Sequence, residues 1–326
     1  MKSIFMDSIS VVVPVYCAEN SLYELYQRIV STLDSYKFEI IFIEDQGGDS
    51  SWNIICDIAK KDKRVIGFQH SKNYGQHNAL LLGIRHANYE YIVTLDDDLQ
   101  HPPEEIPKLM AKLQEGYDIV YGIPKEGQHG IFRNIASKIT KYLLQKSTGI
   151  TEVIDTSSFR AFRTFLREAF INFNNPFVSI DVLLSWGTAQ YASIEVAHNK
   201  RVFGSSNYTF SILARHAINM LISYSLLPLR LATIIGLLFT IFGILLFMII
   251  ISSYLIYGRI VPGFTFLASI IIIFSGAQLF SLGIFGEYLT RIYFRSLGKP
   301  YSVVKRSVGT IDHLNIDKSP NTSRDT

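Results

Sequence analysis

The sequence is poor in cysteine, with only Cys17 and Cys56 among its 326 residues. Neither cysteine lies at the spacing of a metal-ligand motif, and so few thiols suit a protein of the reducing cytosol. No Gly-x-Gly-x-x-Gly motif follows the first apolar run, and there is no Walker A lysine. These absences argue against a cysteine metal site, a dinucleotide-binding domain and P-loop chemistry.

The sequence also lacks a typical secretory signal and a strong net charge. Asp7 interrupts the start of the chain, and the apolar run Ile9–Val15 is short for a signal peptide. The net charge is +3, and the basic residues gather near apolar segments late in the chain. That distribution favours a membrane surface over nucleic acid as the partner.

Long apolar runs are present, by contrast, in the last third of the chain. Hydrophobic residues make up 48% of the sequence, and the excess lies after Ser223. Leu231–Tyr257 and Phe264–Gly286 carry no charged residue, and each is longer than the roughly 20 residues that span a bilayer. They predict two transmembrane helices, 231–257 and 264–286, joined by a short loop. A buried hairpin of a soluble protein is the alternative.

The basic residues around these runs predict their orientation. Arg215 and Arg230 precede the first run, the connecting loop holds only Arg259, and several basic residues follow the second run. Because positive charge collects on the cytoplasmic side, both ends should face the cytoplasm. We expect an interfacial helix over 209–230 and a basic tail over 287–326 that is disordered from Ser307 onward.

Strand and helix patterns alternate before these segments, from the start of the chain to about residue 122. Apolar runs suited to buried parallel strands alternate with amphipathic helices, and Ser21 with Glu24 has the spacing of a capping box for the first helix. The alternation predicts an α/β fold with a mostly parallel sheet covered by helices on both faces. The expected strands are Ile9–Tyr16, Phe38–Ile43, Val65–Phe68, Tyr89–Leu95 and Tyr117–Gly122.

Three consecutive carboxylates, Asp96, Asp97 and Asp98, follow the fourth expected strand. Adjacent acids repel one another, so a cation or strong donors should lie nearby, and carboxylate oxygens suit Mg²⁺ or Mn²⁺. Polar residues also follow the first two strands, at Tyr16–Glu19 and Glu44–Asp45, and such strand ends meet at one edge of a parallel sheet. We therefore expect a nucleotide site with a metal-bridged diphosphate. A solvated acidic turn is the alternative.

A basic amphipathic pattern follows Gly130. Ile131, Ile135 and Ile139 recur at helical spacing, and Arg133 with two lysines supplies positive charge. A helix of this kind can lie on an anionic bilayer surface. Packing against the soluble core is the alternative reading.

Several motifs together resemble glycosyltransferase family 2, specifically its polyisoprenyl-phosphate glycosyltransferases. The residues that carry the resemblance are Val12–Tyr16, Glu39–Asp49, Asn73–Gln76, Asp96–Glu104, Asp155–Arg160 and His198–Tyr208. The resemblance extends to about Arg306 and implies a GT-A catalytic domain over 1–208 followed by the membrane hairpin. The group of polyisoprenyl-phosphate glycosyltransferases includes dolichyl-phosphate mannose synthases and the bacterial undecaprenyl-phosphate glucosyl- and aminoarabinosyl-transferases.

The resemblance implies roles for individual residues. It places four residues around the nucleotide, namely Pro14, Tyr16, Glu19 and Asp45. It assigns Asp96 to the donor and metal side, Asp98 to the metal as principal ligand, and Gln100 to the same ion. Asp97 falls among the nucleotide-sugar residues, although relatives often have a small residue there. Arg133, Arg201 and Ser206 would hold the lipid phosphate, and Asp155 would orient the acceptor or act as base, alongside Asp96 and Arg201 as catalytic residues. A structural Asp155 that caps a turn is the alternative.

The implied activity is metal-dependent, inverting transfer of a sugar from a nucleotide-diphosphate sugar to undecaprenyl phosphate. A UDP-hexose such as UDP-glucose is the expected donor, Mg²⁺ or Mn²⁺ the cofactor and a homotetramer the assembly. The protein would lie in the cytoplasmic membrane and serve cell-envelope glycan modification, such as that of O-antigen.

Two segments depart from the usual family residues at their positions, namely Glu44-Asp45-Gln46-Gly47 and Ser157-Ser158. Transfer to a glycan acceptor and a catalytically silent membrane scaffold are the alternatives, although the Gln-x-x-Arg-Trp motif of processive synthases is absent.

Overall fold

The fold is taken from a computed structural model that describes residues 7–124, 156–174, 178–199, 227–258, 263–298 and 300–309. The chain divides into two compact units. The first comprises residues 1–127, 154–205 and 300–326, and the second comprises 128–153 and 206–299. Each unit is described by itself below.

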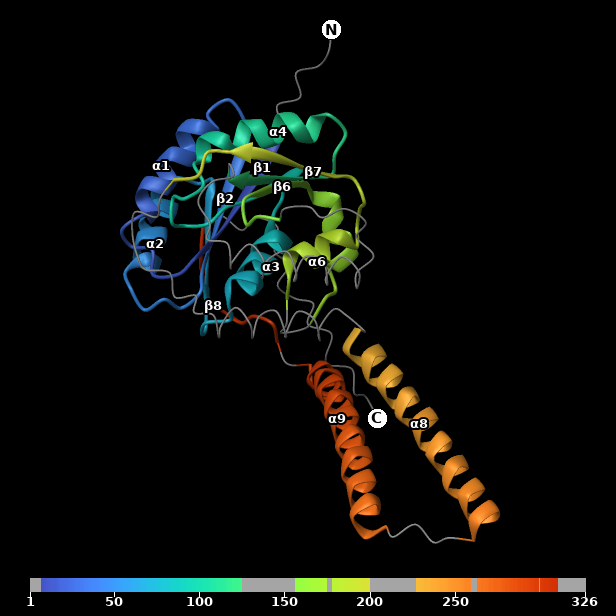
Figure 1. The fold of residues 1–326 in the computed structure, drawn as a ribbon. Coiled ribbons are helices and arrows are strands. Elements are labelled where there is room, and N and C mark those ends of the chain that lie inside the picture. Colours follow the sequence, from blue (N-terminus) through green and yellow to red (C-terminus); the bar gives the residue numbers. More distant parts are fainter. Residues whose placement is uncertain are drawn as a thin grey trace, which may run out of the picture. The chain divides into compact units, whose positions relative to one another are not determined.

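The first unit is built on an eight-stranded sheet with the order β7-β5-β6-β4-β1-β2-β3-β8 (Figure 1). β1 lies parallel to β2 and β4, β2 to β3 and β5 to β7, whereas β6 and β8 are antiparallel to their neighbours. The predicted α/β class with a mostly parallel sheet is therefore confirmed. The strands are β1 Ser8–Val15, β2 Lys37–Glu44, β3 Val65–His70, β4 Tyr91–Thr94, β5 Ile119–Pro124, β6 Arg160–Arg163, β7 Tyr191–Val196 and β8 Val304–Val308.

Two apolar cores, one on each face, hold the sheet between helices. The central strands are apolar on both faces, so Val11 and Val13 of β1 enter one core and Val12 enters the other. Apolar residues of α1, α2 and α4 complete the first core, and those of α3 and α6 complete the second (Figure 1). The helices are α1 Leu22–Thr32, α2 Ser51–Lys61, α3 Gln76–His86, α4 Ile106–Gln114 and α6 Ile180–Ser185, with short 3-10 helices η1 Pro103–Glu105 and η2 Thr164–Phe170.

The start of α1 differs from the sequence expectation in a way that concerns the site. Ser21 is the N-cap residue, but its side chain makes no capping hydrogen bond, so the predicted capping box is wrong. The Ser21 hydroxyl instead donates to the backbone oxygens of Asp97 at 2.7 Å and Ala18 at 3.3 Å. The first helix is thus tied directly to the acidic loop.

The C-terminal part of the first unit also differs from expectation. We expected residues 287–326 to form a basic tail that is disordered from Ser307 onward. In the structure, Val304–Val308 forms β8 beside β3. Backbone hydrogen bonding to an edge strand needs no apolar pattern, which explains why this polar segment was not predicted as a strand. Residues 310–326 lie outside the described residues.

The second unit contains two long helices, α8 Leu227–Tyr257 and α9 Phe264–Ser296. They contact each other through the rings of Phe239 and Phe274, whose centroids are 5.6 Å apart, and Gly243 leaves room for the Phe274 ring. Within the described residues, one helix, Pro228–Ile256, is long and apolar enough to cross a membrane. α9 covers the second predicted span and continues ten residues beyond its predicted end at Gly286. The predicted helix after Gly130 lies outside the described residues. The predicted interfacial helix over 209–230 also lies outside them as far as residue 226, and residues 227–230 form the start of α8.

Candidate active site

The acidic loop begins where β4 ends, at the edge where the carboxyl ends of β1 and β2 also lie. Leu99, directly after the three aspartates, is buried with a φ of 61°, so its side chain anchors a sharply turned backbone in the core. Glu104 of η1 then accepts two hydrogen bonds from Arg28 of α1, at 2.9 and 2.7 Å. The loop is therefore fixed at both ends, by the core and by α1.

Asp97 joins the acidic loop to the loop that follows β1. Its Oδ2 atom accepts a hydrogen bond from the Tyr16 backbone N–H at 2.8 Å, and its own carbonyl accepts the Ser21 hydroxyl. Burial, together with the neighbouring charges of Asp96 and Asp98, raises the pKa of Asp97 to about 7. Asp97 is thus a structural link between the two loops.

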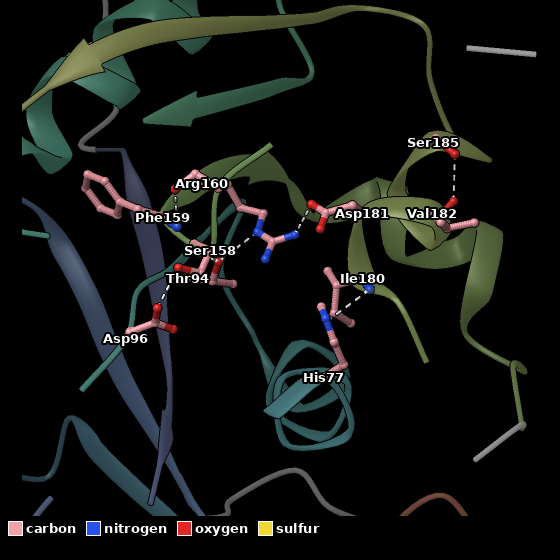
Figure 2. Close-up of polar contacts among 11 residues, drawn as sticks. His77, Thr94, Asp96, Ser158, Phe159, Arg160, Ile180, Asp181, Val182 and Ser185 are labelled. Carbon is pink, nitrogen blue, oxygen red and sulfur yellow. Dashed lines mark hydrogen bonds and ion pairs between the residues drawn. The ribbon is translucent and has the colours of Figure 1, made fainter. Parts of the chain in front are cut away.

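Asp96 is held by donors from two other segments. Its Oδ1 accepts from the Gln76 side-chain amide at 2.6 Å. Its Oδ2 accepts from the Ser158 hydroxyl at 2.6 Å (Figure 2). Gln76 is the first residue of α3, whereas Ser158 lies just before β6. The structure therefore brings together the Asn73–Gln76 motif, the acidic loop and the Ser157-Ser158 pair.

Asp98 and Gln100 form the far side of the loop. Oδ1 of Asp98 accepts the Gln100 backbone N–H at 3.1 Å, which closes a tight turn. The Gln100 carbonyl in turn accepts the Asn199 N–H at 2.8 Å and lies 3.2 Å from Nδ1 of His198. The segment that leads toward Arg201 thus reaches the acidic loop.

A buried ion pair stabilises the backbone next to the acidic loop. Arg160 is 1% exposed; its guanidinium pairs with Asp181 and donates to the Thr94 hydroxyl at 3.2 Å (Figure 2). The Thr94 hydroxyl donates to the carbonyl of Ser158 at 2.7 Å. Thr94 is two residues before Asp96, so the ion pair fixes both the end of β4 and the segment that carries Ser158.

The loop after β1 is joined to the loop after β2. The Glu19 carboxylate accepts the Ser50 N–H and its own N–H donates to Asp49, both at 3.0 Å, and Cys17 adopts a φ of 54°. The Tyr16 side chain is 53% exposed at this edge, while Pro14 is buried inside β1. Tyr16 and Glu19 are therefore placed where a nucleotide could reach them, and Pro14 contributes to the strand.

Asp45 has a largely structural environment. It is 3% exposed, and its carboxylate accepts the backbone N–H groups of Tyr74 at 2.8 Å and Gly75 at 2.7 Å and lies 2.7 Å from Nδ1 of His70. Gly75 has a φ of 91°, a conformation that suits glycine, and α3 begins at the next residue. Asp45 thus sets the position at which α3, and with it Gln76, enters the site.

Four predicted site residues, Arg133, Asp155, Arg201 and Ser206, lie outside the described residues. Four of the described residues contribute to the site although the sequence predicted no role for them. They are Gln76, Thr94, Ser158 and Asp181. Gln76 and Ser158 belong to motifs that carry the family resemblance, which was the available signal. Thr94 and Asp181 carried none, because their contacts depend on how separate segments pack.

The acidic loop offers oxygen donors only, in Asp96, Asp98 and Gln100, and such donors fit a hard divalent cation. Within the described part of the chain, no three His, Cys, Asp or Glu side chains form a group that could hold a metal ion. A Mg²⁺ or Mn²⁺ site built from one or two carboxylates, water and substrate phosphate needs no such group. The donor set therefore fits a cation that arrives with a diphosphate.

The shifted pKa of Asp97 predicts a stability change for Asp97→Asn. The folded protein keeps a proton on Asp97 that the unfolded chain releases near pH 4, so stability falls as pH rises from about 4 to about 7. Asparagine keeps an oxygen for the Tyr16 N–H but carries no charge. After discounting for partial exposure, we expect the metal-free variant to be more stable than wild type by about 2 kcal/mol at pH 8 and equal at pH 4.

Thermal unfolding in EDTA at the two pH values measures this difference. Asp49→Asn is the matched control, because the Asp49 carboxylate accepts hydrogen bonds from Glu19 and Ser51. It should not become more stable at pH 8. An Asp97→Asn effect that is the same at pH 4 and pH 8 would contradict the assigned charge state.

Comparisons with known proteins agree with this geometry. The profile of glycosyl transferase family 2 matches residues 10–170. An undecaprenyl-phosphate 4-deoxy-4-formamido-L-arabinose transferase of Shewanella sediminis is 38% identical over 300 residues, which cover 90% of this chain and 91% of that protein. The transferase of the same name from Proteus mirabilis is 34% identical over 309 residues, 93% of this chain and 95% of that protein.

The fold is also found in solved structures of a more distant protein. Glucosyl-3-phosphoglycerate synthase of Mycobacterium tuberculosis in complex with phosphoglyceric acid is 17% identical, with a TM-score of 0.50, over 66% of this chain and 79% of that one. Its complex with Mn²⁺, UDP-glucose and phosphoglyceric acid is 16% identical, with the same score and the same coverage. These likenesses show the GT-A fold alone. The matches over almost the whole chain go further: this chain is a glycosyltransferase and belongs to glycosyl transferase family 2, among its polyisoprenyl-phosphate glycosyltransferases.

Proposed function

We propose that this protein transfers a sugar from a nucleotide-diphosphate sugar to a polyisoprenyl phosphate, undecaprenyl phosphate in the first instance, at the cytoplasmic surface of a membrane. The observation that carries the proposal is the link between two loops by Asp97. It places the exposed Tyr16 and the carboxylates of Asp96 and Asp98 at one edge of the sheet. A nucleoside and its diphosphate need such a pair of neighbouring surfaces, one for the base and one for the phosphates.

The donor sugar is the finer part of the proposal. Glucose, the expectation from the sequence, is not confirmed, and the names of the two relatives with 38% and 34% identity favour 4-deoxy-4-formamido-L-arabinose. We therefore propose UDP-4-deoxy-4-formamido-L-arabinose as the first donor and UDP-glucose as the second.

Each site residue has a separate proposed role in the reaction. Tyr16 and Glu19 contact the nucleoside, and Asp96 orients the donor. Asp98 and Gln100 would hold Mg²⁺ or Mn²⁺, which would supply positive charge against the diphosphate leaving group. The acceptor phosphate is already anionic at neutral pH, so a strong general base is less necessary than for a sugar hydroxyl. Attack from the face opposite the leaving group inverts the anomeric carbon.

The membrane helices fit a lipid acceptor. Each buried CH₂ of a polyisoprenyl chain stabilises it in the bilayer by about 0.8 kcal/mol, so the lipid stays in the membrane and the soluble donor must come to it. We propose that α8 and α9 both span the bilayer, with the first unit on the cytoplasmic side, and that Arg133, Arg201 and Ser206 bind the acceptor phosphate. Asp155 as base and a homotetrameric assembly stay predictions.

A donor screen tests the proposed function. Purified full-length protein in detergent, with Mn²⁺ or Mg²⁺ and undecaprenyl phosphate, is incubated separately with UDP-4-deoxy-4-formamido-L-arabinose, UDP-glucose and a GDP-hexose. We expect mass spectrometry of the lipid fraction to show one sugar added to undecaprenyl phosphate, with the arabinose donor preferred. Lipid product from UDP-glucose alone would overturn the choice of sugar, and its absence with every donor would overturn the function.

A further inference from the structure

The carboxylate of Asp96 is held on both sides by neutral side chains from distant parts of the chain. The Gln76 amide donates to Oδ1 and the Ser158 hydroxyl to Oδ2, each at 2.6 Å. Gln76 and Asp96 are 20 residues apart, and Ser158 and Asp96 are 62 apart. Two short hydrogen bonds from opposite directions leave the carboxylate little rotational freedom.

Gln76 is itself fixed by backbone contacts. The carboxylate of Asp45 accepts the N–H groups of Tyr74 and Gly75, and the positive φ of Gly75 turns the chain into α3. The side chain of Gln76 is exposed, so it enters the site from a rigid backbone position without being enclosed.

Ser158 is fixed from the other side by the buried ion pair. Its carbonyl accepts the Thr94 hydroxyl at 2.7 Å, and Arg160, next to Asp181, donates to Thr94 (Figure 2). The hydroxyl that reaches Asp96 therefore belongs to a residue whose backbone is anchored in the core.

The chemistry of the two donors suits a carboxylate that must act on a ligand. A neutral amide or hydroxyl orients a carboxylate without cancelling its charge, whereas a lysine or arginine would neutralise it and weaken its attraction for a cation or its acceptance of a sugar hydroxyl.

We propose that Gln76 and Ser158 are positioning residues that hold Asp96 in the orientation required by the nucleotide-sugar donor. The proposal rests on the proposed function for the identity of the donor. It assigns no contact with the lipid acceptor to either residue. Loss of the hydrogen bond from either side chain should therefore weaken binding of the nucleotide sugar and leave binding of the lipid acceptor unchanged.

Kinetics of paired variants test this assignment. Ser158→Ala should raise the donor KM about tenfold, with the KM for undecaprenyl phosphate unchanged, because a hydrogen bond to a charged group is lost. Ser158→Thr keeps the hydroxyl and should stay within about threefold of wild type. Ser31→Ala, at an exposed serine of α1 whose hydroxyl donates to the Arg28 carbonyl in the same helix, is the control and should behave as wild type.

The two replacements of Gln76 separate orientation from space filling. Gln76→Met keeps the approximate size of the side chain but removes the amide donor, so it should bind the nucleotide sugar as weakly as Gln76→Ala. A side chain that only fills space predicts that Gln76→Met binds like wild type. Asn73→Ala, in the same exposed loop, is the control for general disturbance of the loop.

Binding of UDP and Mn²⁺ to the purified full-length variants, followed by Mn²⁺ electron paramagnetic resonance, gives a readout that needs no turnover. We expect Ser158→Ala and Gln76→Met to weaken binding about tenfold at unchanged thermal stability. Wild type that binds UDP and Mn²⁺ but transfers no sugar would overturn the proposed function and leave this test intact. Ser158→Ala that binds like Ser31→Ala, Gln76→Met that binds like wild type, or no binding by wild type would overturn the positioning role.

Discussion

Asp98→Ala should reduce sugar transfer on the order of 10²–10³-fold and remove its response to added Mn²⁺ or Mg²⁺. The reason is that Asp98 contributes the carboxylate assigned as the principal metal ligand. Its hydrogen bond to the Gln100 N–H also shapes the turn that carries the second proposed ligand. Initial rates over a metal titration, with undecaprenyl phosphate and the preferred donor, measure the effect.

The matched control for this variant is Asp57→Ala. Asp57 is an exposed aspartate of α2 whose partner is Lys60, three residues along the same helix. We expect it to keep wild-type turnover and metal response. Both variants should remain in the membrane fraction, because neither change touches α8 or α9. Unchanged metal-dependent turnover in Asp98→Ala would contradict the assignment of this residue to the metal.

Arg160→Met should destabilise the first unit by about 3 kcal/mol, or roughly 10 °C in Tm. The guanidinium is buried and pairs with Asp181, so its removal leaves a partly buried carboxylate without that partner and the Thr94 hydroxyl without that donor. The expected loss is moderate because the Asp181 side chain is 26% exposed and water can reach it. Thermal unfolding at pH 7.5, followed by tryptophan fluorescence, checks the prediction.

A double variant shows whether the ion pair is the cause. Arg160→Met with Asp181→Asn removes both charges, so it should regain part of the stability that Arg160→Met alone loses. The matched single variant Asp181→Asn leaves a buried arginine unpaired and should also be destabilised. Losses that simply add in the double variant would show that the two side chains act independently, contrary to the contact in the structure.

The parallel core could be predicted from the sequence because burial on both faces leaves a direct pattern. Val11, Val12 and Val13 of β1 are all apolar, and all three are buried. The strand order could not be predicted in the same way. β6 lies between β4 and β5, and β8 returns from the end of the chain to pair with β3, because both depend on backbone pairing between distant segments.

The candidate site was predictable in its charges and not in its supports. Three aspartates, Asp96, Asp97 and Asp98, are adjacent in sequence. Their mutual repulsion predicts a nearby cation or strong hydrogen-bond donors. That Asp97 bonds the Tyr16 N–H, 81 residues away, depends on how two loops meet. Asp97 therefore has a structural contact that its sequence position did not predict. Asp45, placed by resemblance at the nucleotide, gains a structural task in holding the start of α3.

The most direct test of the central claim is the identity of the acceptor. Purified protein receives the preferred nucleotide sugar together with equal concentrations of undecaprenyl phosphate, undecaprenyl diphosphate and a soluble oligosaccharide. Mass spectrometry then follows every product. We expect a single sugar residue on undecaprenyl phosphate, and only when Mn²⁺ or Mg²⁺ is present. Sugar attached to the oligosaccharide, or released as free sugar while the lipid phosphate stays unmodified, would contradict it.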